Sequence, residues 1–186
     1  MIAMNRLKVL TLLVSLVVAS SARASLVTVR FEPSSQTVNL GDTFNVQIVA
    51  DISSPVVGWG LDFAIASPPI LSETAAPVIG AAWVPAPAPD GDGLASLAFP
   101  NSVSGTGVLL ATLTLHANAI GATDLLLSVT PGDLTEGFAL DPTGFAELTI
   151  QPGHANVVPE PSTIGLLALI GLGMLRGRPS RCRMRT

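Results

Sequence analysis

The chain has 186 residues, of which 48% are hydrophobic and only 12% are charged, so its composition excludes an intrinsically disordered protein. This length predicts one domain with accessory segments. The formal net charge of −4 hides a strong asymmetry: all thirteen acidic residues, but only Arg30 of the nine basic ones, lie between Ser25 and Glu160. That portion therefore carries −12, which disfavours nucleic acid and anionic lipid as partners because their phosphates repel it.

The first segment has the form of a secretory signal peptide. Two basic residues precede an apolar run from Val9 to Val18, and small residues follow it. Ala22 and Ala24 form the small-x-small pattern of a signal-peptidase site. We therefore expect signal peptidase to remove residues 1–24 and to leave Ser25 as the first residue; an uncleaved membrane anchor is the alternative.

Residues 25–156 are predicted to form an all-β domain, since they show period-two alternation and no helical periodicity. In residues 43–50 and 59–66 every second residue is apolar, as in strands with one buried face. Residues 107–116 are apolar on both sides, which predicts a central strand. Other strand-like runs, separated by turn formers, cover Leu26 to Glu32, Gln36 to Leu40, Leu94 to Phe99, Thr123 to Val129 and Phe145 to Ile150. About eight strands, or nine if 78–84 joins, predict an antiparallel β-sandwich.

The two tryptophans are predicted to differ in exposure. Trp59 alternates with apolar residues and is expected in the core, whereas Trp83 is the better candidate for an exposed contact. It stands beside Pro85 to Gly93, a loop that proline and glycine should keep out of any sheet. Asp90 and Asp92 in this loop are oxygen ligands of the kind calcium prefers, but two carboxylates are too few, so we expect a solvated turn.

We expect no catalytic residue, no cofactor and no metal site. His116, at the end of a predicted strand, and His154, in a predicted linker, have no neighbouring cysteine or acidic cluster at metal-ligand spacing. No serine stands in a nucleophile-elbow sequence, and the single cysteine, Cys182, lies near the C-terminus. No spacing singles out a carboxylate pair for acid–base chemistry.

The chain ends with an apolar run followed by arginines. Residues 164–175 would span about 18 Å as a helix, at about 1.5 Å per residue, against about 30 Å of hydrocarbon, so they form a marginal membrane anchor. Basic residues beside an apolar segment stay in the cytoplasm, which predicts that this segment enters the inner membrane with the preceding domain outside it. The predicted cytoplasmic tail contains Arg176, Arg178, Arg181, Arg183 and Arg185.

Residues 157–186 resemble a PEP-CTERM sorting signal, because "VPEP" is followed by a glycine-rich apolar segment and then by arginines. The resemblance implies that an exosortase recognises Pro159, Glu160 and Pro161, removes the helix, and releases the protein or attaches it at the surface. Prolines favour an extended, accessible peptide, and a glutamate is costly in hydrocarbon, so it marks the interface. A permanent single-span anchor is the alternative.

Three stretches between Val27 and Ile150 resemble successive strands of a cohesin-type domain: "VTVRFEPSSQTVNLGDTFNVQIVADI", "VVGWGLDFAIASPPILS" and "VSGTGVLLATLTLHANAIGATDLLLS". The resemblance implies a nine-stranded jelly-roll sandwich, a fold shared with carbohydrate-binding modules, and a role in adhesion or ligand presentation. Fold alone does not determine function.

Together these patterns predict an exported, non-enzymatic protein of the cell surface or extracellular matrix. It would act in adhesion, matrix assembly or ligand binding, with an unknown envelope protein or polysaccharide as its partner. Two alternatives remain open at this point: an envelope hydrolase with an unidentified carboxylate site, and a purely structural acidic matrix protein.

Overall fold

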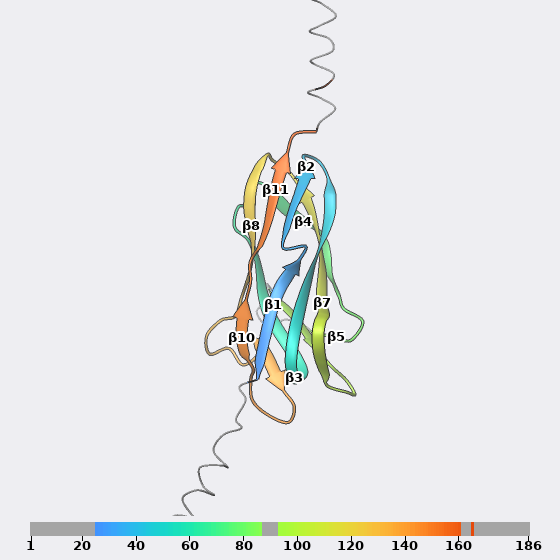
Figure 1. Ribbon diagram of the computed structural model, residues 1–186, viewed down its shortest axis with the longest axis vertical. Helices are drawn as coiled ribbons and strands as arrows, with labels where there is room; N and C mark the ends of the chain where they lie inside the picture. The colour runs from blue at the N-terminus through green and yellow to red at the C-terminus, as the bar shows by residue number, and fades with distance from the viewer. Residues whose placement is uncertain (1–24, 87–92, 161–164, 166–186) are drawn as a thin grey trace, which may run out of the picture.

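A computed structural model of the chain describes residues 25–86, 93–160 and 165, which include an elongated assembly of two β-sheet layers (Figure 1). The expected signal peptide, the expected apolar C-terminal helix apart from Gly165, and the expected arginine tail lie outside these residues. No helix in the described ranges is long and apolar enough to cross a membrane. The strands are β1 (Leu26–Glu32), β2 (Ser35–Asn39), β3 (Thr43–Ile65), β4 (Leu71–Ile79), β5 (Val84–Ala86), β6 (Gly93–Leu97), β7 (Val103–Ala117), β8 (Gly121–Ser128), β9 (Gly137–Leu140), β10 (Glu147–Ile150) and β11 (Gly153–Val158).

The long strand β3 belongs to both layers. Residues 43–52 pair with β1 and β7, which gives the first sheet the order β10-β1-β3-β7-β4. Residues 56–65 pair with β6, β8 and β9, and the second sheet has the order β2-β11-β8-β3-β6-β5. Register shifts between Ile52 and Val56 mark the bend at which the chain passes between the layers.

Most neighbouring strands are antiparallel, as the sequence predicts, but two pairs are parallel, which the sequence did not predict. β10 runs parallel to β1, and β11 runs parallel to β2. The reason is that β1 continues into β2, and β10 into β11, each time crossing from the first sheet to the second without reversing direction. The two parallel pairs therefore follow one another along the same edge of the sandwich (Figure 1).

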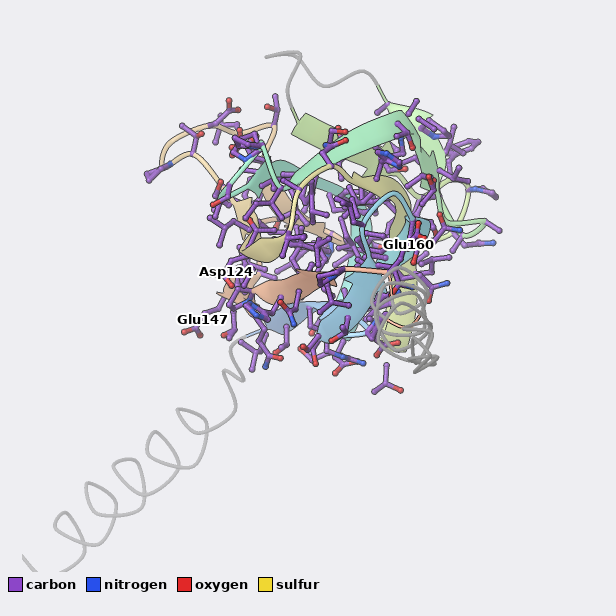
Figure 2. All side chains as sticks on the ribbon, turned by 90° about the horizontal axis from the view of Figure 1, so that it is seen from above. Asp124, Glu147 and Glu160 are labelled. Atoms are coloured by element: carbon purple, nitrogen blue, oxygen red, sulfur yellow. The ribbon has the colours of Figure 1, made fainter. Side chains whose placement is uncertain are left out.

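The hydrophobic core lies between the layers and consists of alternate side chains from both sheets. Phe44, Val46 and Ile48 are buried while their sequence neighbours at 43, 45 and 47 are exposed, which confirms the predicted alternation. Phe31 of β1 packs edge-to-face on Phe63 of β3, with ring centroids 6.2 Å apart. Viewed along the long axis, side chains fill the space between the layers (Figure 2).

The predicted central position of residues 107–116 is confirmed, because β7 pairs with β3 on one side and with β4 on the other. A bulge interrupts its alternation: Ile48 pairs with Ala111, whereas the next residue, Val49, pairs with Leu109. Leu110 is the extra residue, and it is fully buried.

Four expectations about individual segments are wrong. Residues 43–50 and 59–65 are parts of one strand rather than two, and β4 and β5 take the place of the optional ninth strand at 78–84. Pro85 lies in β5 rather than in a loop; a proline is tolerated there because β5 pairs only with β6 and so is an edge strand. His154 lies in β11 (Gly153–Val158) rather than in a linker.

Candidate functional site

The predicted processing sites lie at opposite ends of the described body. Ser25 precedes β1 at one end, where its carbonyl accepts a hydrogen bond of 2.7 Å from the Glu147 amide. Pro159 and Glu160 follow β11 at the other end, and both are exposed (Figure 1). Figure 2 looks along the long axis and shows Glu160 on the side of the molecule opposite Glu147.

The remaining predicted processing residues lie outside the described ranges: Ala22, Ala24, Pro161, Arg176, Arg178, Arg181, Arg183 and Arg185.

The two histidines lie in different sheets and have separate partners. His116 Nδ1 in β7 is 3.1 Å from the Thr43 hydroxyl. His154 Nδ1 in β11 is 2.8 Å from an Asp124 carboxylate oxygen. Within residues 25–86 and 93–160, no three His, Cys, Asp or Glu side chains are grouped so that they could hold a metal ion. Asp90 and Asp92 lie outside these ranges.

Both tryptophans are buried, so the prediction for Trp59 is confirmed and the expected exposure of Trp83 is wrong. Trp59 is 3% exposed and Trp83 is 5% exposed, and their rings pack edge-to-face at 6.2 Å. The Trp83 indole N–H donates a 3.0 Å hydrogen bond to the Leu109 carbonyl. Gly80 makes this burial possible, because a Cβ there would stand 2.2 Å from that carbonyl oxygen and would push the segment away from β7.

A groove of about 240 Å³ lies on the outer face of the second sheet. Trp59 and Leu61 point into the core, so Gly58 and Gly60, which alternate with them along β3, face outward. The floor of the groove is formed by small residues, namely Gly58, Ala95, Gly137 and Ala139. Because these residues have little or no side chain, the floor lies close to the sheet backbone.

The walls of the groove are large apolar side chains from three segments. Leu97 of β6 is 55% exposed, Phe145 is 49% exposed and Leu134 is 80% exposed. Val84 of β5 pairs with Leu97 and adds another exposed apolar side chain on the same face. Adjoining exposed apolar side chains of this kind mark interaction surfaces in soluble proteins.

The loop that carries Leu134 lies across β3 and is internally hydrogen-bonded. The Asp133 carboxylate accepts bonds of 2.8 Å from the Thr135 amide and 2.6 Å from its hydroxyl, and these bonds hold the pKa of Asp133 below its usual value. The Glu136 carboxylate accepts a hydrogen bond from the Thr130 amide and so closes the loop. Leu134 is therefore presented to solvent by a constrained backbone.

Sequence reasoning missed this site because its parts are far apart in the chain. The available signal was "GWG" at residues 58–60. Two glycines on the outer face of a strand, on either side of a buried tryptophan, indicate a close approach by another segment.

Comparison with solved structures identifies the fold. A non-cellulosomal cohesin from the archaeon Archaeoglobus fulgidus is 13% identical, with a TM-score of 0.55 over 77% of this chain and 98% of that chain. The third ScaB cohesin of R. flavefaciens, solved in complex with a group 1 dockerin, is 15% identical, with a TM-score of 0.55 over 75% and 99% of the two chains. A type I cohesin–dockerin complex from Clostridium thermocellum gives 9% identity and a TM-score of 0.54 over 75% and 99%.

No known protein family matches the sequence, and no curated protein matches it. The solved structures show that the chain has a cohesin-like β-sandwich fold. At identities this low, the similarity shows the fold alone.

Proposed function

We propose that the β-sandwich is a non-enzymatic domain that binds a protein partner in the outer groove of the second sheet. The observation that carries this proposal is the set of exposed apolar walls, Leu97, Leu134 and Phe145, standing over a floor of small residues. Burial of such walls against a partner is favourable, by about 25 cal/mol for each Å² of apolar surface removed from water. The cohesin-like fold supports the same conclusion, since two of the solved neighbours were determined in complex with a dockerin.

We further propose that the protein is exported and then sorted through its C-terminal segment. Signal peptidase would remove residues 1–24, and an exosortase would recognise Pro159, Glu160 and Pro161. Two observations support accessibility: Pro159 and Glu160 are exposed, and they follow directly after the last strand. Folding of the body therefore leaves the start of the motif outside the sheet.

Partner binding is tested with the full chain, purified in detergent and immobilised through biotin on Cys182, its single cysteine. Mixed with an envelope extract of the native host, the wild type should capture a specific protein, and Leu134→Asp should lose it. Val78→Asp is the matched control, because Val78 is also an exposed apolar residue but lies on β4 of the first sheet. Equal capture by the wild type and Leu134→Asp would contradict the proposal.

Sorting is tested in the native host by substituting alanine for Pro159, Glu160 and Pro161 together. We expect a longer, membrane-retained species on an immunoblot. Unchanged processing would remove exosortase recognition from the proposal and leave partner binding intact.

A further inference from the structure

We infer that the partner of this groove is a basic protein segment, in which an apolar side chain that fits the groove is flanked by lysine or arginine. This inference rests on the proposed function and names the chemical class of its partner. It is carried by the distribution of charge around an otherwise apolar surface.

Two acidic residues are close in sequence to lining residues of the groove. Asp133 precedes Leu134 in the wall-forming loop, and its carboxylate is tied to Thr135, another lining residue. Asp141 lies in the turn between two lining residues, Ala139 and Phe145, and it is exposed. The depressed pKa of Asp133 keeps its carboxylate ionised at neutral pH.

No basic side chain of the body offsets these acids. Arg30 is the single lysine or arginine between Ser25 and Glu160. It lies on β1 in the other sheet, where its guanidinium forms ion pairs of 2.7 Å with Glu32 and 2.8 Å with Asp51. The potential at the groove is therefore negative, and the apolar floor strengthens it because field lines concentrate over low-dielectric surfaces.

A basic segment satisfies both features of this surface. Its apolar side chain covers the exposed walls, and its cations pair with the carboxylates of Asp133 and Asp141. A neutral or acidic segment would desolvate those carboxylates without a counter-charge, which is unfavourable. The attraction is screened over about 10 Å at 0.1 M salt, so binding should weaken as salt rises.

A protein segment is favoured over a polysaccharide by the aromatic side chains available. Sugar rings stack on exposed aromatic faces, and the two tryptophans, which offer the largest faces, are both buried. The sequence contains no tyrosine. Apart from the buried Trp59, Phe145 is the one aromatic residue that lines the groove.

The test is selection of random twelve-residue peptides displayed on phage, using the full chain immobilised through Cys182 and, in parallel, its Leu134→Asp variant. We expect peptides enriched by the wild type alone, with an excess of lysine and arginine around an apolar residue. The most enriched peptide is then synthesised, and its affinity is measured by fluorescence anisotropy at 50 and 300 mM salt.

Charge removal at the groove should weaken this peptide at low salt, and the difference should shrink at high salt. We expect a three- to tenfold loss of affinity for Asp141→Asn and a similar loss for Asp133→Asn. Glu73→Gln is the matched control, since it removes an acidic charge from β4 in the first sheet, opposite Leu115 of β7, and should change affinity less than twofold.

The outcomes separate the two levels of the proposal. Peptides that depend on Leu134 but carry no excess of basic residues overturn the basic partner and leave the protein-binding groove standing. Identical peptide pools from the wild type and Leu134→Asp overturn both. Binding of a glycan panel that is lost in Leu134→Asp, with no peptide selected, overturns the protein partner and assigns the groove to a polysaccharide.

Discussion

Gly60 fixes the position of the groove wall, and substituting it is the sharpest test of the described geometry. An alanine Cβ at this residue would stand 2.2 Å from the Thr135 carbonyl oxygen and 3.1 Å from the Glu136 Cα. Both are backbone atoms, so no side-chain rotation relieves the clash and the loop must move away from β3. Overpacking of this kind costs about 1–3 kcal/mol, and the entropy gained on replacing glycine returns about 0.4–1 kcal/mol.

We therefore expect Gly60→Ala to lower the free energy of unfolding by about 1–2 kcal/mol, or the Tm by roughly 3–8 °C for a domain of this size. Thermal unfolding followed by circular dichroism measures the shift. Gly58→Ala is the control on the same face, where the nearest atom is a terminal methyl of Leu97, at 2.9 Å, which can rotate away. A Gly60→Ala protein as stable as Gly58→Ala and the wild type would refute the close packing of the loop on β3.

Replacing each tryptophan with phenylalanine should lower the free energy of unfolding by different amounts. Trp83→Phe leaves the Leu109 carbonyl without its donor, whereas the Trp59 indole N–H makes no hydrogen bond; urea unfolding should show about 1–2 kcal/mol more loss for Trp83→Phe, and equal losses would contradict this. Burial raises the pKa of Glu73 above its usual 4.5, so its charged form is the destabilised one, and Glu73→Gln should raise the Tm at pH 7 with no gain below about pH 4. The lowered pKa of Asp133 has the opposite sign: its stabilisation is present at pH 7 and is lost as pH falls through the folded pKa. Asp133→Asn should therefore lower the Tm at pH 7, and the difference from the wild type should shrink as pH falls. Tm measured against pH for both variants and the wild type checks these signs, and parallel curves would contradict both.

The regular part of the fold could be predicted because its strands alternate strictly. Every second side chain from Phe44 to Ile48 is buried, and the period of two is visible in the sequence. The same rule divided β3 into two strands, because alternation breaks where the chain bends between the sheets near Pro55. It also missed β9 and β5, which have four and three residues and are too short to show a period.

The groove could not be predicted, because tertiary packing creates it. Its floor and walls come from β3, β6, β9 and the segments around Leu134 and Phe145, which only the sheet order brings together. The burial of Trp83 also depends on tertiary packing and could not be predicted. Its neighbours in sequence suggest an exposed position, but the absence of a side chain at Gly80 lets the segment reach β7 and bury the ring.

The groove lies near one end of the domain, so an N-terminal anchor and a C-terminal anchor would orient it differently toward a membrane. Phe145 of the groove lies two residues before Glu147, whose amide bonds the Ser25 carbonyl, so the groove belongs to the same end as the start of β1. The chain leaves β11 at the opposite end (Figure 1). An uncleaved N-terminal anchor would therefore hold the groove end against the anionic membrane surface, which the acidic body avoids because like charges repel. Attachment through the C-terminal segment would instead turn the groove outward, where a basic partner could reach it. Under the proposed function, removal of residues 1–24 in the native host would leave the groove end free of a membrane.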